Sequence, residues 1–162
     1  MIDFEIPEET RAIREKVREF VQEECIPAES QLEHREYEEV LWELRDKARA
    51  QGLWCPFIPV EHGGMGLKPL ANALVQMELG ESFLGALALN TQGPDDATML
   101  TLLEHGTDEQ KEKYLKPLLE GRKRICYSMT EKAAGADATG MQTTAVLEGD
   151  NWVLNGEKWF SS

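Results

Sequence analysis

The chain has 162 residues, 41% of them hydrophobic, and its 17 basic and 30 acidic residues give a formal net charge of −13. This length is enough for one domain with a core, or for one domain and the beginning of another. The negative charge disfavours binding to nucleic acid and to anionic membranes, and no apolar run approaches the roughly 20 residues that span a bilayer. We therefore expect no nucleic-acid or membrane partner.

The amino-terminal residues and the cysteines favour a cytoplasmic location. Residues 1–20 show neither an apolar signal core nor an arginine- and serine-rich transit pattern. Cys25, Cys55 and Cys126 are far apart and odd in number, so they cannot all pair with one another. The three histidines are equally scattered. We expect reduced cysteines and no metal site.

Helical patterns begin near the amino terminus. Pro7 suits a first helical position, and apolar residues recur at helical spacing through residues 7–24. We expect Pro27 to end this helix, because proline cannot donate a backbone hydrogen bond. A second helix is predicted over residues 36–51, and Gly52 is predicted to stop it.

A loop and a buried helix are predicted next. Residues 53–69 contain three prolines and three glycines, which exclude a regular element. The loop is either a long surface connection or a segment that packs on something bound, because Trp54, Phe57 and Ile58 are apolar. Residues 70–89 are apolar nearly all round, which predicts one buried helix.

Two more helices are expected before the pattern changes. Either Asp95 or Asp96 can cap the first of them. The second, over residues 107–121, is predicted to open with a capping box between Thr107 and Gln110.

The remaining residues indicate β structure. We expect a basic patch and a strand over residues 122–130, then two strands that meet at a Gly149–Asp150 hairpin turn. The predicted fold class is therefore α+β. A mainly α-helical domain over residues 1–121 precedes the beginning of a small antiparallel β domain over residues 122–162, which looks truncated because its strand edges lack partners.

One short segment combines features that suit a ligand. In CYSMTEKAAGAD, residues 126–137, a strand-like run passes into small residues whose backbone can closely approach a flat or phosphate-bearing ligand. The same pattern is also typical of a permissive turn between strands. Spacing alone leaves both interpretations open.

Several motifs in order resemble the acyl-CoA dehydrogenase family. YSMTEKAAGAD resembles the family's TEP-x-x-GSD segment, and the T-x-A, GD and NG-x-K elements follow it. Upstream, PVEHGGMG and GTDEQKEKYLKPLLEG resemble two further family motifs. The resemblance covers essentially the whole chain.

This resemblance implies a fold and an activity. The family has an N-terminal helical domain, a middle β domain and a C-terminal helical bundle, and the bundle is absent from these 162 residues. Its members are oxidoreductases of fatty acid metabolism, including β-oxidation, that dehydrogenate the Cα–Cβ bond of an acyl-CoA and pass a hydride to N5 of FAD. The resemblance also implies an electron-transfer flavoprotein as electron acceptor and a homodimer or homotetramer. The family's catalytic base lies in the bundle, so no catalytic residue is identified, and the fragment alone is expected to be inactive.

The resemblance also implies individual site residues. Thr130 is expected to bind the pyrimidine edge of the flavin through its hydroxyl, and Phe160 is expected to pack on the ring. The expected cofactor-binding residues are Tyr127, Met129, Thr130, Gly135, Ala136, Phe160, Ser161 and Ser162, and Ala136 is also expected to contact the substrate.

Three residues depart from the family pattern. Lys132 replaces a proline, Ser128 replaces a smaller or apolar residue, and Ala136 replaces a serine that serves the flavin pyrophosphate and the thioester. Glu131 and Glu157 lie in the matched motifs but not at the position of the family's base. We expect both to be structural or solvated carboxylates.

The departures leave two alternatives. The chain could belong to a flavin-dependent relative with another substrate, of the nitroalkane oxidase or hydroxylase type. It could also be a non-catalytic helical interaction module with a degenerate flavin loop.

Overall fold

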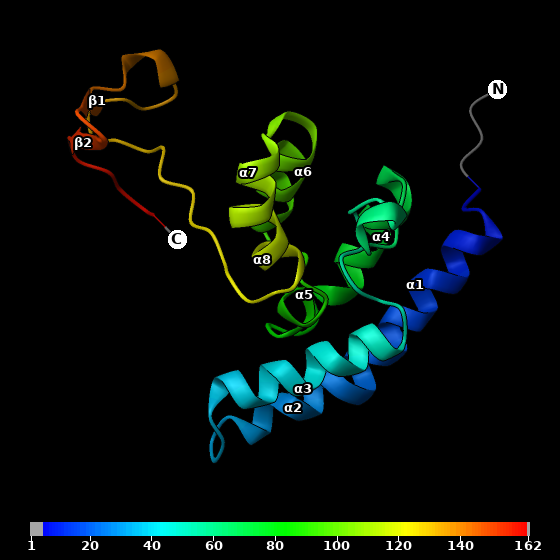
Figure 1. The fold of residues 1–162 in the computed structure, drawn as a ribbon. Helices are drawn as coiled ribbons and strands as arrows, with labels where there is room; N and C mark the ends of the chain where they lie inside the picture. The colour runs from blue at the N-terminus through cyan, green and yellow to red at the C-terminus, as the bar shows by residue number, and fades with distance from the viewer. Residues whose placement is uncertain (1–4, 162) are drawn as a thin grey trace. The chain divides into compact units, whose positions relative to one another are not determined.

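The computed structural model describes residues 5–161, and the chain divides into two compact units between Arg124 and Ile125. The first unit is helical and the second contains a two-stranded antiparallel sheet, which confirms the predicted α+β class (Figure 1). Within the described residues the helices are α1 (Glu8–Phe20), α2 (Ile26–Gln31), α3 (Tyr37–Ala50), α4 (Pro69–Leu79), α5 (Gly85–Ala88), α6 (Asp95–His105), α7 (Asp108–Gln110) and α8 (Lys116–Leu119), and the strands are β1 (Thr144–Glu148) and β2 (Asn151–Asn155). Short 3-10 turns span Val60–His62 and Ala138–Gly140.

The first helix does not end at Pro27, contrary to the prediction. A π-helical turn over Val21–Cys25 joins α1 to α2, so the helical path continues to Gln31. Proline has no backbone N–H to donate to the preceding turn, and its ring clashes with that turn in a regular α-helix. The wider π-helical turn accommodates both. A second π-helical turn, Lys111–Leu115, precedes Pro117 in the same way.

The second predicted helix is confirmed as α3. Its C-terminal stop is Gly52, which has a φ of +70° that favours glycine, and the Leu53 amide bonds back to the Ala48 carbonyl at 2.8 Å. Apolar side chains from α1, α3, α4, α5 and the segments next to them build the core of this unit. The largest among them are Phe20, Val40, Leu44, Leu53, Val75, Leu79, Leu84 and Leu89.

The single helix predicted over residues 70–89 is wrong, because the chain breaks it into α4 and α5. The Glu29 carboxylate accepts a 2.6 Å hydrogen bond from the Ser82 hydroxyl in the turn between them. Beyond that turn, a Cβ on Gly85 would lie 2.4 Å from the Leu79 carbonyl oxygen, so the close return of the chain requires glycine. These contacts come from distant or non-periodic residues, which hydrophobic patterning does not detect.

One of the two predicted helix caps is confirmed. Neither Asp95 nor Asp96 is the N-cap of α6, because that position is Pro94 and both aspartates lie in the first helical turn. There they still complement the positive end of the helix dipole. The capping box of α7 forms as predicted, since Thr107 and Gln110 each accept a hydrogen bond from the other's backbone amide.

The loop over residues 53–69 packs into its own unit. Leu53, Cys55 and Ile58 are fully buried, and Trp54 is nearly so. The first part of the loop, residues 53–58, is therefore part of the core of the helical unit, whereas most of residues 59–69 are exposed. No bound partner is needed to explain these buried side chains.

The last turn of the helical unit is capped by side chains from four other positions. Helices leave their final carbonyls without intrahelical partners, so a buried helix end needs donors. Two arginines, a tryptophan and an asparagine supply them here. Asn90 Nδ2 donates to Leu118 O at 2.9 Å, Trp54 Nε1 to Leu119 O at 2.9 Å, Arg49 Nη2 to Glu120 O at 2.8 Å and Arg45 Nη1 to Gly121 O at 2.6 Å.

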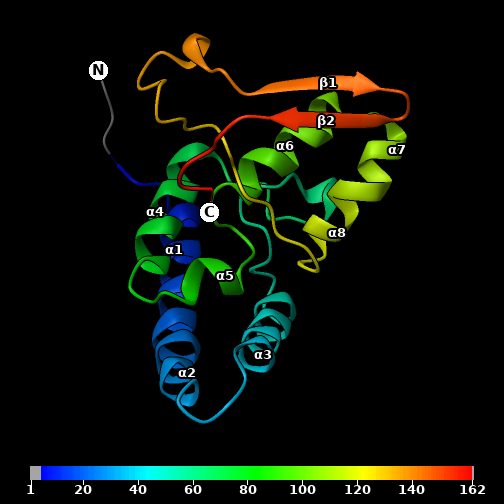
Figure 2. The same cartoon turned by 90° about the vertical axis from the view of Figure 1, so that its left-hand side faces the viewer.

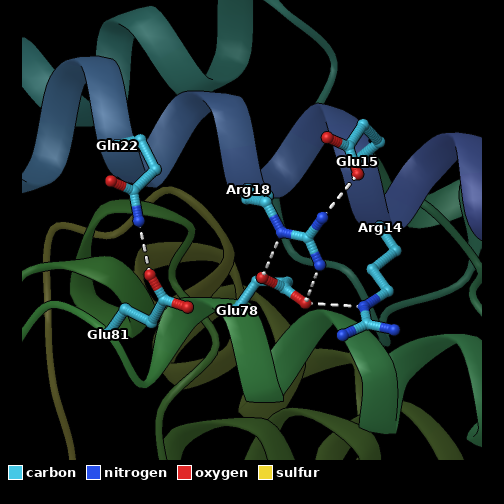
Figure 3. Close-up of polar contacts among 6 residues, drawn as sticks. All are labelled: Arg14, Glu15, Arg18, Gln22, Glu78 and Glu81. Atoms are coloured by element: carbon cyan, nitrogen blue, oxygen red, sulfur yellow. Dashed lines mark hydrogen bonds and ion pairs between the residues drawn. The ribbon is translucent and has the colours of Figure 1, made fainter.

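A buried carboxylate joins α1 to α4, which lie side by side (Figures 1 and 2). Glu78 is 4% exposed and accepts from Arg14 Nε at 2.6 Å and from Arg18 Nε at 2.9 Å (Figure 3). The hydrogen bond from Arg18 lowers the pKa of Glu78 most, and Arg14 adds to the effect. The two arginines neutralise the Glu78 carboxylate, which would otherwise be an unpaired charge buried at the contact between the helices.

The C-terminal unit contains the predicted hairpin. Strands β1 and β2 are antiparallel, with Val146 opposite Val153, and Gly149 in the turn has a φ of +62°. The strand predicted over residues 122–130 does not form. The backbone there is not paired into a sheet within the described residues, and an unpaired segment cannot satisfy the hydrogen bonds of a strand.

Removing the Glu78 carboxylate should destabilise the helical unit. In Glu78→Ala two arginines lose their shared partner, but both reach solvent, so we expect a loss of about 1–2 kcal/mol in the free energy of unfolding. Chemical denaturation followed by circular dichroism measures it. The matched control is Glu15→Ala, which removes an exposed ion pair with the same Arg18 and should cost less than about 0.5 kcal/mol. Equal losses in both variants would contradict a special role for the buried carboxylate.

Candidate functional site

Two segments of the C-terminal unit, residues 127–130 and residues 158–161, are joined by individual hydrogen bonds and carry most of the expected flavin contacts. The Trp159 amide donates to the Thr130 carbonyl at 2.9 Å, and the hydroxyls of Ser128 and Ser161 are hydrogen-bonded to each other. The two contacts join residue 130 to residue 159 and residue 128 to residue 161, so the two segments run in opposite directions.

This pairing leaves three large side chains open to solvent. Tyr127 is 61% exposed, Met129 is 42% exposed and Phe160 is 80% exposed. The Tyr127 hydroxyl contacts the Met129 sulfur at 3.5 Å, and the Phe160 ring meets the ring of Trp159 edge-on with centroids 6.0 Å apart. Exposed aromatic and thioether groups of this kind are suited to covering a flat aromatic ligand.

One carboxylate fixes the segments that surround these residues. Glu131 is 6% exposed and accepts hydrogen bonds from the amides of Gln142 at 2.6 Å and Thr143 at 3.0 Å. Lys158 Nζ lies 2.7 Å from the same carboxylate and also donates to the Met129 carbonyl at 3.1 Å. Glu131 therefore connects the strand-like segment, the start of the hairpin and the segment that follows the hairpin.

The electrostatics of this cluster keep Glu131 ionised. The hydrogen bond from Lys158 lowers its pKa most, followed by hydrogen bonds from Thr143 and from the Gln142 amide, and the resulting pKa is about 2. A carboxylate with several donors and an adjacent ammonium is strongly favoured in its charged form. The expectation that Glu131 is structural agrees with these contacts.

The loop of small residues that follows Glu131 is also hydrogen-bonded to it. The Ala134 amide donates to the Glu131 carbonyl at 3.2 Å, and Gly135 and Ala136 are exposed beyond it. A Cβ on Gly135 would meet nothing within 4 Å, so the main chain is open on this side. Asp137 then turns the chain by accepting from the Thr139 amide at 3.0 Å.

Hydrogen bonds between the two segments thus bring together the stretches that carry five of the expected residues: Tyr127, Met129, Thr130, Phe160 and Ser161. Gly135 and Ala136 lie on the loop that Glu131 holds, and Ser162 lies outside the described residues. Sequence reasoning missed Lys158 as the partner of Glu131. The signal was available, because both residues belong to matched motifs, but their separation of 27 positions gave no local pattern.

Family profiles match both units of the chain. The profile of the acyl-CoA dehydrogenase N-terminal domain matches residues 7–122, and that of the acyl-CoA dehydrogenase middle domain matches residues 126–162. The chain belongs to the acyl-CoA dehydrogenase family. The hairpin and its preceding segment therefore correspond to part of the middle domain of an acyl-CoA dehydrogenase.

Individual relatives and solved structures agree with this assignment. Acyl-CoA dehydrogenase family member 11 of Gallus gallus is 38% identical over 91% of this chain. A structure from Mycobacterium abscessus, described as an acyl-CoA dehydrogenase, is 36% identical over 98% of the chain with a TM-score of 0.85. An acyl-CoA dehydrogenase of Bacillus anthracis, solved in complex with FAD, is 30% identical over 98% of the chain with a TM-score of 0.67.

These acyl-CoA dehydrogenases are longer than the chain. It spans 20% of the Gallus gallus protein, 43% of the Mycobacterium abscessus chain and 27% of the Bacillus anthracis chain. Within residues 5–161, no helix is long and apolar enough to cross a membrane. The same residues contain no group of three or more histidine, cysteine, aspartate or glutamate side chains that could hold a metal ion.

Acid should release the segments that Glu131 holds. Because folding lowers the pKa of Glu131 from 4.5 to about 2, its stabilising contribution is complete above pH 4.5 and is lost as the pH falls toward 2. We expect the hydrogen-exchange protection of the Gln142 and Thr143 amides to fall across this window. Glu131→Gln should show low protection at neutral pH and no such transition.

The matched control is Glu157→Gln. Glu157 is an exposed carboxylate of the same unit. It accepts a hydrogen bond from Trp159 Nε1 at 2.7 Å and makes none of the hydrogen bonds that Glu131 makes. This variant should keep both the protection of the two amides and its pH dependence. Wild-type protection in Glu131→Gln would contradict the anchoring role.

Proposed function

We propose that the protein is a flavin-dependent acyl-CoA dehydrogenase whose C-terminal unit, residues 125–162, contacts FAD. The observation that carries the proposal is the hydrogen bonding of Thr130 to Trp159 and of Ser128 to Ser161 inside the part that matches the family's middle domain. This pairing gathers side chains that neither segment could present alone. Family membership supplies the cofactor and the reaction class.

The residues present fit a flavin. Tyr127, Met129 and Phe160 expose aromatic and thioether surface that a planar ring would remove from water. The exposed Thr130 side chain supplies a hydroxyl on the same segment, and the main chain at Gly135 is uncrowded. We therefore assign ring contacts to the first group, and polar and pyrophosphate contacts to Thr130 and the loop.

The proposed reaction is the α,β-dehydrogenation of an acyl-CoA thioester. When bound, FAD supplies the hydride acceptor at its N5 atom. This chain's residues bind and orient the ring, exclude water from one side of it, and place hydroxyls near its polar edge. We assign the catalytic base to a C-terminal helical bundle, which the additional length of the relatives can accommodate. An electron-transfer flavoprotein as electron acceptor and a homodimer or homotetramer are part of the same proposal.

Ala136 favours a second candidate. The family usually has serine at this position, and alanine cannot donate a hydrogen bond to a pyrophosphate or a thioester. Since Ala136 is exposed on the loop, its missing hydroxyl alters the surface that a ligand would meet. The second candidate is therefore a flavin-dependent relative that oxidises a substrate other than an acyl-CoA.

Anaerobic titration of the full-length protein distinguishes these functions. We expect it to purify with FAD and to lose the flavin absorbance in the visible range when an acyl-CoA of suitable length is added. Flavin binding without bleaching by any acyl-CoA would favour the second candidate. A protein that binds no FAD would contradict the proposal as a whole.

The matched variant for this titration is Ala136→Ser. Restoring one hydrogen bond donor should tighten FAD binding or speed bleaching about threefold to tenfold, because one hydrogen bond contributes about 1 kcal/mol. Gly135 and the Glu131 anchor remain unchanged in this variant. No change in either quantity would show that the Ala136 position does not contact the flavin or the thioester.

A further inference from the structure

The backbone of Phe160 is unusual. Its φ is +54°, in the left-handed region that a residue with a Cβ rarely adopts. In the described part of the chain, Cys55 and Asn90 are the other non-glycine residues with positive φ, and both are buried, whereas Phe160 is 80% exposed. Burial therefore does not hold Phe160 in this conformation.

Hydrogen bonds on both sides of Phe160 can hold it. On one side, the Trp159 amide donates to the Thr130 carbonyl at 2.9 Å. On the other side, the Ser161 hydroxyl is bonded to the hydroxyl of Ser128. An unfavourable backbone conformation persists when its surroundings over-determine it, and these two bonds fix the residues before and after Phe160.

The two bonds differ in what they require of the sequence. The bond from Trp159 is made by the main chain, so any residue other than proline could supply its amide. The bond between Ser128 and Ser161 requires two side-chain hydroxyls. Each is exposed, and this bond exists because both positions carry a hydroxyl.

We infer that Ser128 is a positioning residue that, through its bond to Ser161, holds Phe160 in the left-handed conformation. We call the hydrogen bond between Ser128 and Ser161 the latch. Its link to FAD rests on the proposed function, in which Phe160 contacts the flavin ring. Without the latch, the Phe160 backbone relaxes toward negative φ and the direction of its ring changes. Ser128 itself needs no contact with flavin or substrate.

The decisive experiment is nuclear magnetic resonance of the full-length protein after any bound FAD has been removed. A positive φ brings the amide and α protons of a residue close together, so wild-type Phe160 should give a strong intraresidue cross-peak between them. In Ser128→Ala this cross-peak should weaken to the intensity of ordinary extended residues. Ser128→Thr keeps a hydroxyl and should retain the strong cross-peak.

Three further variants separate the loss of this bond from general destabilisation. Ser161→Ala removes the other half of the same bond, and the double variant with Ser128→Ala should lose no more than either single variant. Ser30→Ala removes an exposed hydroxyl of the helical unit and should leave Phe160 unchanged. A strong Phe160 cross-peak in Ser128→Ala would overturn the inference.

FAD affinity then tests the connection to function separately. Ser128→Ala should weaken FAD binding about threefold to tenfold, the effect of losing one hydrogen bond that orders a contact residue. Ser128→Thr should bind FAD as the wild type does. If the cross-peak weakens but FAD affinity stays unchanged, the latch stands, and the assignment of Phe160 to the flavin site is wrong.

Discussion

The C-terminal unit depends on the ionised carboxylate of Glu131. A two-stranded hairpin is marginal in water, and most side chains of β1 and β2 are exposed, so the hairpin lacks an apolar core of its own. Glu131 replaces that core with charge-assisted hydrogen bonds to Gln142, Thr143 and Lys158. The residues that we assign to the flavin lie on segments that Glu131 holds together.

The helical unit, in contrast, is stabilised mainly by an apolar core. Its apolar core is continuous, and polar contacts are needed mainly where a helix ends or a charge is buried. Arg45 and Arg49 serve the end of α8, and Glu78 serves the contact between α1 and α4. This unit can therefore tolerate two prolines within its helices, because π-helical turns absorb them locally while the core stays packed.

Local features of the sequence predicted most of the fold. The α3 helix with its Gly52 stop, the capping box at Thr107 and the hairpin turn at Gly149 each depend on a few neighbouring residues, and all three are confirmed. One error arose where a distant residue decides. The helix over residues 70–89 is interrupted by a contact with Glu29.

The candidate site shows the same division. The motifs identified which residues to consider, but spacing could not show that residues 127–130 and residues 158–161 lie side by side, because a hairpin and a loop separate them. Nor could it reveal the left-handed backbone of Phe160, since aromatic residues rarely adopt it. Such features require the long-range bonds that only the folded chain displays.

The central claim is that the paired segments around Glu131 form the flavin-contacting surface of this unit. Titration of isotope-labelled, flavin-free full-length protein with FAD, followed by amide chemical shifts, tests it most directly. The account predicts that the largest shifts fall on residues 127–130, 134–136 and 159–161. Shifts confined to the helical unit, with these three segments unchanged, would contradict it.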